Sequence, residues 1–168
     1  MTTVTEAVAL IDSHVRPWPA EQVPIDAAAG RVIAQDVAAE RDIPSFDRVT
    51  MDGIAIAFAA YAEGRHDFVS IGTQAAGVPP FDVTDQGNCV RVMTGAVLPR
   101  GTDSVVPIER ITLDDEVAKI DQLASVERGQ FVHNKGSDRK GGSVVLRNGT
   151  PWARRRLLCS QASGRPAC

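Results

Sequence analysis

The chain has 168 residues, of which 43% are hydrophobic and 23% charged, a composition typical of a soluble globular protein with room for one ordinary core or two small ones. Its net charge of −3 conceals an asymmetry, because residues 151–168 hold four arginines and no acid, leaving 14 basic against 21 acidic residues in 1–150. The excess of acidic residues in 1–150 argues against nucleic-acid binding, which requires a basic surface. No apolar run approaches the roughly 20 residues of a membrane helix.

The three cysteines, Cys89, Cys159 and Cys168, are odd in number and have no metal-binding spacing. They favour a reducing compartment without a disulfide framework. The amino terminus lacks the basic and apolar regions of a secretion signal, so we expect a cytoplasmic location. Cys89 lies in an apolar stretch and is expected in the core rather than as a nucleophile.

The first 46 residues mix helical and extended patterns. Apolar residues at helical spacing predict a helix to about Val15, with Thr3 or Thr5 as its N-cap and two prolines just beyond its end. A short strand at 23–25, a helical turn at 26–29 with Gly30 as C-cap, and a strand at 31–37 are expected next.

The middle of the chain changes to short extended runs separated by Gly and Pro turns. Such spacing predicts a β-rich domain, a partly closed barrel. The expected strands cover residues 53–57, 67–72, 88–93, 104–107, 117–120 and 130–133, and one more is expected within 141–152.

Residues 151–168, "PWARRRLLCSQASGRPAC", form a break in composition. Leu157, Leu158 and Ala162 fit one helix face, but Gly164 and Pro166 would end such a helix at once. We expect a frayed end in preference to a functional basic tail.

Two short motifs have the residues for oxyanion or metal chemistry. In "VRVMTGAVLPRGTD" a hydroxyl and a glycine, Thr94 and Gly95, follow a strand, which suits an oxyanion cradle, although a plain turn is the commoner meaning. Asp52 in "DRVTMDG" and Asp138 in "HNKGSD" are hard oxygen ligands that would suit Mg²⁺ if they meet. Each alone is usually a turn former.

Other common active sites find no support in the sequence. His14, His66 and His133 are scattered, which makes a zinc site improbable on spacing. No nucleophile elbow or Cys-His arrangement is present. The residues alone therefore indicate a β-rich acidic protein whose turns are candidates for oxyanion binding.

Three segments resemble a known family. "IPSFDRVTMDGIAIAF", "VRVMTGAVLPRGTDSVVPIE" and "FVHNKGSDRKGGSVVLRNGT" are similar to the motifs "lPpFdnSaMDGYAv", "vRImTGApvPeGaDaVvmqE" and "nvRpkGeDvkkGevvLkkGt" of the molybdopterin molybdenumtransferases, the MoeA and gephyrin C-terminal-domain family. The resemblance spans about residues 4–150 in family order and corresponds to the amino-terminal portion only.

This resemblance implies an α+β fold in two parts. An elongated mixed α/β first domain would comprise 1–46 and 140–168, with 151–168 atypical, and a β-barrel-like second domain would comprise 47–139. Family enzymes act as dimers in molybdenum cofactor biosynthesis. With Mg²⁺ they insert molybdate into adenylylated molybdopterin and release AMP.

The family's site residues map onto this chain by motif. Asp52, Thr94 and Asp138 correspond to catalytic positions, with Asp52 and Asp138 as the expected metal ligands. Gly53, Gly95 and His133 correspond to cofactor-binding positions, and the Gly95 amide would donate to molybdate or phosphate oxygens together with Thr94.

The chain departs from the family in several places. His133 stands where the family usually has Arg, which grips an oxyanion through two donors. Val49, Ile54 and Ser137 replace Ser, Tyr and Glu. Family enzymes also continue into further domains, so the chain is expected to be inactive alone. A shifted reading frame would explain the tail, and a short protein that has kept the fold as a non-catalytic binding or dimerisation module is the alternative.

Overall fold

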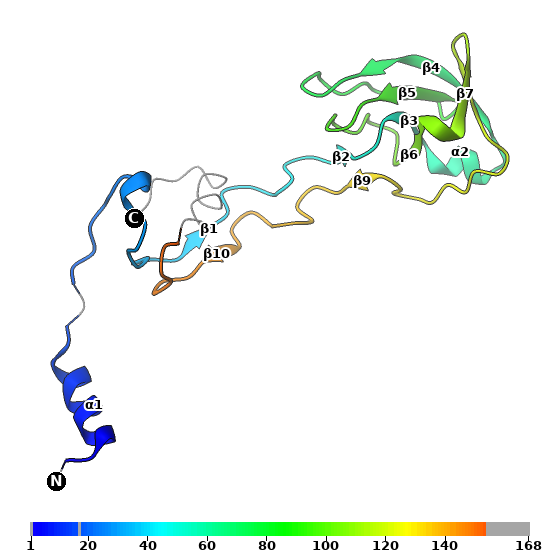
Figure 1. The fold of residues 1–168 in the computed structure, drawn as a ribbon. Coiled ribbons are helices and arrows are strands. Elements are labelled where there is room, and N and C mark those ends of the chain that lie inside the picture. Colours follow the sequence, from blue (N-terminus) through cyan, green and yellow to red (C-terminus); the bar gives the residue numbers. More distant parts are fainter. Residues whose placement is uncertain (1, 17, 154–168) are drawn as a thin grey trace. The chain divides into compact units, whose positions relative to one another are not determined.

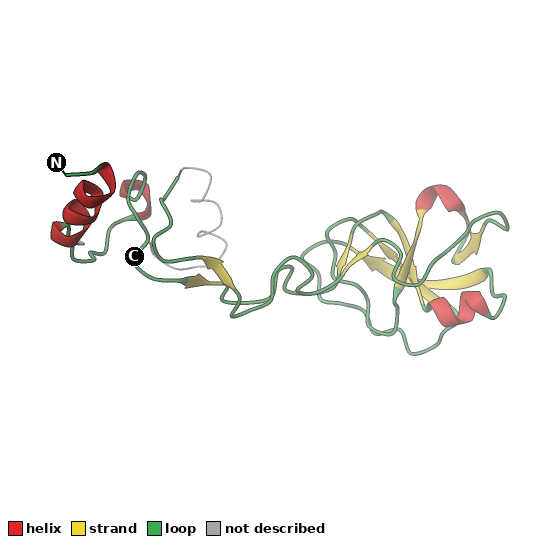
Figure 2. Ribbon diagram, turned by 90° about the horizontal axis from the view of Figure 1, so that it is seen from below, coloured by secondary structure: helices red, strands yellow, loops and turns green. Residues whose placement is uncertain are grey.

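The computed structural model describes residues 2–16 and 18–153. Ala39–Ser143 forms one compact unit, and the described residues before and after it form the other (Figures 1 and 2). The features expected of the arginine-rich tail fall on residues 154–168 and lie outside the described residues.

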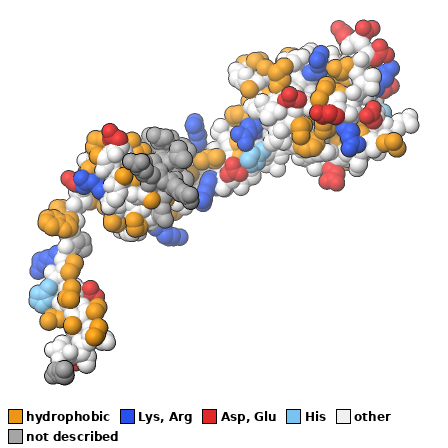
Figure 3. Space-filling model, in the orientation of Figure 1, with side chains coloured by type: hydrophobic (Ala, Val, Ile, Leu, Met, Phe, Trp, Pro, Cys, Tyr) orange, Lys and Arg blue, Asp and Glu red, His pale blue; other side chains and the backbone are white. Residues whose placement is uncertain are grey.

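The chain begins with helix α1 (Val4–His14), as its apolar spacing predicts. Thr3 is the N-cap: its hydroxyl accepts a hydrogen bond from the Glu6 amide, and the Glu6 carboxylate accepts one from the Thr3 amide. This capping box satisfies amide groups that have no partner within the helix. No residue of α1 is buried, and its apolar side chains are visible in Figure 3.

A small core holds the rest of this unit together. It consists of Ala28, Ile33, Leu146 and Trp152, brought together by the 3-10 turn η1 (Ile25–Ala27) and by the antiparallel pair of β1 (Val37–Ala38) and β10 (Val144–Leu146). Segments more than 100 residues apart in sequence thus share one core.

Two strand predictions for this unit are wrong. Residues 23–25 form no strand, because Pro24 has no N–H to give to a ladder and instead caps η1. The strand expected at 31–37 shrinks to a bridge between Val32 and Pro151 and to β1. The Asp36 carboxylate accepts a hydrogen bond from the Asn148 amide between these points, so side-chain bonding interrupts the ladder.

The unit Ala39–Ser143 contains a six-stranded mixed sheet in the order β6-β3-β5-β4-β8-β7. Strands β4 and β5 run parallel, and the other neighbours are antiparallel. The strands are β3 (Gly53–Ile56), β4 (Asp67–Gln74), β5 (Asn88–Val92), β6 (Ser104–Pro107), β7 (Ile111–Asp114) and β8 (Val117–Ile120).

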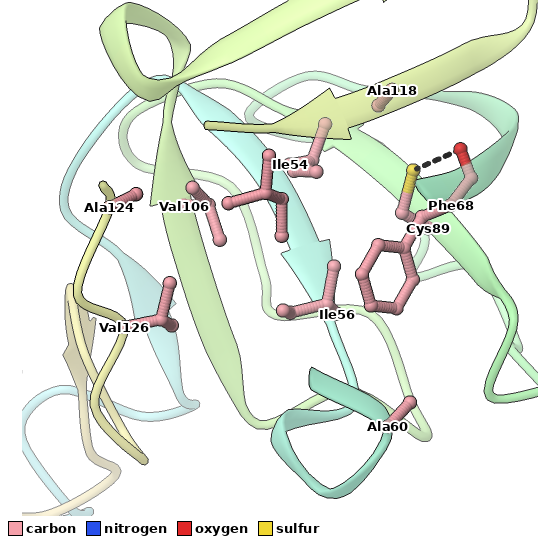
Figure 4. Close-up of a cluster of buried hydrophobic side chains, with 10 residues drawn as sticks. Ile54, Ile56, Ala60, Phe68, Cys89, Val106, Ala118, Ala124 and Val126 are labelled. Atoms are coloured by element: carbon pink, nitrogen blue, oxygen red, sulfur yellow. Dashed lines mark hydrogen bonds between the residues drawn. The ribbon is translucent and has the colours of Figure 1, made fainter. Parts of the chain in front are cut away.

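Strand β3 is buried on both faces. Ile54 and Ile56 belong to one apolar cluster, with Phe68 and Cys89 (Figure 4), whereas Ala55 belongs to a second cluster with strand neighbours from β5 and β6. Alternate side chains of a strand point to opposite faces, so an apolar cluster packs on each face of the sheet at β3. The fold is α+β, mostly sheet with few helices, and the sheet forms a half-barrel.

The strands expected at 53–57, 67–72, 88–93, 104–107 and 117–120 are confirmed, and the one expected within 141–152 is β10. Four elements of this unit were not predicted: β2 (Arg48–Val49), α2 (Phe58–Ala62), the 3-10 turn η2 (Ile108–Arg110) and β7. The alternation in "ITLD" was the available signal for β7, which pairs with β8 through a turn at Asp115.

Candidate functional site

The candidate residues gather around a short two-stranded sheet and an adjoining bridge in the unit Ala39–Ser143. Strand β2 (Arg48–Val49) pairs on one side with β9 (Val132–His133). On its other side it pairs with the segment after β5, where Arg48 bridges to Val97 and the Val49 amide donates to the Ala96 carbonyl at 2.9 Å. Residues far apart in sequence are thereby fixed by backbone hydrogen bonds.

Asp52 and Thr94 meet because β3 and β5 are antiparallel. Gly53, the first residue of β3, is the partner of Val92, the last residue of β5, so the residues just outside these two ends are neighbours. The Asp52 Oδ1 atom accepts hydrogen bonds from the Thr94 hydroxyl at 2.6 Å and from the Thr94 amide at 2.7 Å. These two donors lower the pKa of Asp52, the hydroxyl contributing most.

The oxyanion cradle expected at "TGA" therefore already holds a carboxylate of the chain itself. Both Thr94 donors are directed to Asp52. The Gly95 amide, expected to face an oxyanion, instead donates to the Val49 carbonyl at 2.9 Å. Gly95 has φ +88°, a conformation that favours glycine. In this structure Thr94 and Gly95 position Asp52 and β2 rather than present free donors.

Gly53 is needed for the close approach of β3 and β6. A Cβ at this position would lie 1.9 Å from the Val106 carbonyl oxygen, so no other residue fits without moving the backbone. Gly53 is buried in the sheet. It therefore keeps Asp52 in place from the adjacent position.

His133 lies in a second cluster with Arg48 and Asp138. The Arg48 guanidinium lies 3.0 Å from His133 Nδ1, and His133 Nε2 lies 2.8 Å from Asp138 Oδ1. Because arginine can only donate, Nδ1 must accept and Nε2 must carry the proton. The imidazole is thus a neutral bridge between a cation and an anion.

The loop that carries Asp138 is braced by two further aspartates that the sequence did not single out. Asp47 accepts a hydrogen bond from the Lys135 amide at 2.7 Å, and Asp42 accepts one from the Gly141 amide at 2.9 Å. The Gly141 amide is the main reason that the pKa of Asp42 is lowered, with smaller effects of the Lys140 and Lys135 charges. These bonds fix the loop against residues 42–47.

The two carboxylates expected to share a metal belong to different clusters. Within residues 2–16 and 18–153, no hydrogen bond or ion pair joins Asp52 to Asp138, and no group of three or more His, Cys, Asp or Glu side chains is placed to hold a metal ion. Mg²⁺ commonly takes only one or two protein carboxylates and completes its shell with water and substrate oxygens. The ionised, exposed Asp52 fits that donor chemistry.

The buried thiol is a core residue, as expected. Cys89 is fully buried, its Sγ lies 3.9 Å from the Phe68 carbonyl oxygen, and burial raises its pKa to about 11. A thiol this hard to ionise is a poor nucleophile.

In the described part of the chain, no helix is long and apolar enough to span a membrane.

Comparison with known proteins identifies relatives over nearly the whole chain. The family described as "MoeA N-terminal region (domain I and II)" matches residues 2–162, which extends past residue 150, where the motif resemblance ends. A molybdopterin molybdenumtransferase of Synechocystis is 41% identical over 157 residues, covering 90% of this chain and 40% of the relative. One from Haemophilus influenzae is 33% identical over 133 residues, covering 79% and 32%.

Solved structures agree with the sequence relatives. A molybdopterin biosynthesis MoeA protein from Pyrococcus horikoshii has a TM-score of 0.78 at 32% identity and is matched over 87% of this chain and 39% of its own. A second structure of that kind gives a TM-score of 0.84 at 27% identity, over 96% and 42%. The chain thus spans about 40% of the length of such relatives. On the family match, the shared fold and the three motifs, the chain belongs to the MoeA N-terminal region family, comprising its domains I and II.

Proposed function

We propose that this chain supplies the amino-terminal part of a molybdopterin molybdenumtransferase, which inserts molybdate into adenylylated molybdopterin and releases AMP. The relatives that it matches carry that enzyme name. The observation that supports the assignment most is the Asp52–Thr94 pair, an exposed carboxylate that is oriented by two donors from one residue and has a lowered pKa.

The chemistry of Asp52 follows from this geometry. Two hydrogen bonds to Oδ1 fix the orientation of the carboxylate and stabilise its ionised form, which lowers its pKa. Asp52 would then be a ligand for Mg²⁺, and Asp138 a second candidate from its own cluster. When bound, the ion would neutralise negative charge on the phosphate oxygens of the substrate.

The rest of the family's arrangement extends this proposal. We place the remaining catalytic groups in the portion of the relatives that this chain does not cover, about 60% of their length. A homodimer in the cytoplasm, without nucleic-acid or membrane partners, is part of the same proposal. The elongated form of the first domain and the domain boundaries near residues 46 and 139 stay predictions.

A second candidate function is a non-catalytic binding or dimerisation module. The observation that favours it is coverage, since the chain spans only 40% of the Synechocystis relative. Such a module would keep the sheet and the ladder around β2 without turnover. Both functions require the same fold, so an activity measurement must separate them.

The decisive experiment is a chimera in which this chain replaces the matching amino-terminal part of the Synechocystis enzyme. We expect molybdate-dependent AMP release from adenylylated molybdopterin, and we expect Asp52→Asn to reduce it by about a hundredfold or more, as is typical when a charge-stabilising group is removed from a site. Asp67→Asn, at an exposed strand position of the same unit, is the matched control. A folded chimera without activity would favour the binding module.

A further inference from the structure

Arg48 differs from the other arginines whose side-chain partners are described. Arg31, Arg100 and Arg128 each form an ion pair with a carboxylate. Arg48 is exposed, and its guanidinium is held by the imidazole of His133 at 3.0 Å. Since that imidazole is neutral in this arrangement, the direct partner of Arg48 does not cancel its charge.

The position of Arg48 is fixed on both sides by the backbone. It is the register partner of His133 in the β2–β9 pair and bridges to Val97 on the other side. A side chain that starts from a fixed backbone loses less conformational freedom when it binds a ligand.

The guanidinium itself is oriented through a chain of two hydrogen bonds. Asp138 accepts the Nε2 proton of His133 at 2.8 Å, which leaves Nδ1 free to accept from Arg48 at 3.0 Å. The Asp138 amide donates to the Ile43 carbonyl at 3.0 Å, so this end is anchored as well. Asp138 and His133 thus act as positioning residues for Arg48.

Donors remain for a ligand. A guanidinium has five N–H groups, and the contact with His133 uses one of them. The planar fork of the others matches two oxygens of a tetrahedral oxyanion. No acidic side chain forms an ion pair with Arg48 anywhere in residues 2–16 and 18–153.

Arg48 also lies close enough to Asp52 to serve one substrate. Asp52 lies four positions after Arg48, and an extended chain spans at most about 3.6 Å per residue, so their Cα atoms are no more than about 14 Å apart. Both side chains are exposed. This separation is within the reach of a substrate that carries more than one anionic group.

We propose that Arg48 is an oxyanion-binding residue of this chain, oriented by the Asp138–His133 pair, and that it takes molybdate or a phosphate group. The choice of these two ions rests on the proposed function. The binding of a tetrahedral oxyanion by Arg48 is a property of this chain alone and is measured without turnover.

The test is an NMR titration of the full 168-residue chain with sodium molybdate and, separately, with phosphate, at constant ionic strength set by chloride. We expect Arg48→Gln to weaken binding of the preferred ion about tenfold, and Arg48→Lys to weaken it less because the charge is kept while the fork is lost. Arg110→Gln makes the same charge change on η2 of the same unit and should leave binding unchanged. Tighter binding of molybdate or of phosphate identifies which ion the subsite takes.

The positioning role has its own readout. Asp138→Asn should weaken binding about threefold and change the ¹⁵N shifts of the His133 ring, because the Nε2-protonated tautomer loses its carboxylate partner. A purely structural residue would not move the tautomer. If Arg48→Gln fails to fold, oxyanion binding by Arg48→Lys is compared with that of the unmodified chain instead.

Two results would overturn the inference: no binding of either ion by the unmodified chain, or equal binding by Arg48→Gln and Arg110→Gln. Neither depends on the enzyme activity of the chimera. An inactive chimera whose amino-terminal part still binds an oxyanion through Arg48 would refute the proposed function and leave this inference standing.

Discussion

Thr94 donates two hydrogen bonds to a single oxygen of Asp52, from its hydroxyl at 2.6 Å and from its amide at 2.7 Å. The two residues are 42 positions apart in sequence and meet only because β3 and β5 pair in antiparallel register. The pair turns an ordinary loop aspartate into an oriented carboxylate with a lowered pKa. It is the local feature on which the proposed metal chemistry depends.

Thr94→Val should raise the pKa of Asp52 towards its ordinary value. The substitution keeps the shape of the side chain and the amide donor but removes the hydroxyl, which is the largest cause of the lowering. The ¹³C shift of the Asp52 carboxyl carbon, followed against pH, gives the pKa directly. Thr112→Val, at an exposed position of β7, is the matched control and should leave the Asp52 titration unchanged.

The same variant has a consequence for stability in acid. A group whose folded-state pKa lies below its unfolded-state pKa contributes stability that is present above the unfolded-state pKa and lost as pH falls through the folded-state pKa. Thr94→Val reduces this difference, so its stability should decline less steeply with acid than that of the unmodified chain. Denaturant melts across the acidic range measure this. Parallel declines would show that the hydroxyl does not set the pKa.

Gly53→Ala should destabilise the sheet by about 3 kcal/mol, at the upper end of what overpacking costs. The added Cβ would meet the Val106 carbonyl oxygen at 1.9 Å, and a backbone atom within a paired strand cannot turn away as a side chain can. Urea denaturation gives the free energy of unfolding.

Gly64→Ala is the comparison for that variant. Gly64 has φ +96° but nothing within 4 Å of the position of an added Cβ, so only backbone strain is expected, about 1 kcal/mol. An equal loss in the two variants would mean that the approach of β3 to β6 is not the constraint at Gly53.

The local pattern of apolar runs and turn residues was sufficient to predict most strands of the unit Ala39–Ser143. In β4 and β5 the apolar runs are bounded by Gly, Pro and Asp turns, and these signals act over a few residues. The predictions were wrong for two reasons. Pro24 has no N–H for a ladder and caps a local 3-10 turn, whereas at Asp36 a tertiary bond overrides local preference, because the carboxylate accepts from the Asn148 amide 112 residues away.

The candidate site was predictable as a list of residues but not as an arrangement. The motifs pointed to Asp52, Thr94 and Asp138, yet the spacing of these motifs does not indicate which of the three side chains are in contact. Arg48 was missed because its partner His133 is 85 residues away and the pairing depends on the register of β2 and β9. Register is set by the burial of whole strands, which no short motif encodes.

Phe68→Ala should cost about 3 to 5 kcal/mol, the range for removal of a buried aromatic ring. Phe68 is fully buried against Ile54 and Ile56 (Figure 4). Val69, the next residue of β4, is 44% exposed, and Val69→Ala should cost about 1 kcal/mol or less. Equilibrium unfolding of both variants tests which face of β4 is buried. If β4 were shifted by one residue, Val69→Ala would cost more stability than Phe68→Ala.

Mn²⁺ can test whether the two aspartates hold one metal or act separately, because it shares the preference of Mg²⁺ for oxygen ligands and broadens nearby NMR signals. We expect substoichiometric Mn²⁺ to broaden the amide signals around Asp52 and Thr94, and Asp52→Asn to abolish that effect. Asp138→Asn should leave it, since Asp138 is bonded to His133 and no interaction joins it to Asp52 in the part of the chain that the structure describes. A different result would show a shared ion: Mn²⁺ would broaden the signals around Asp52 and around Asp138, and either substitution alone would abolish the broadening at both. The two carboxylates would then have to approach each other when the metal binds.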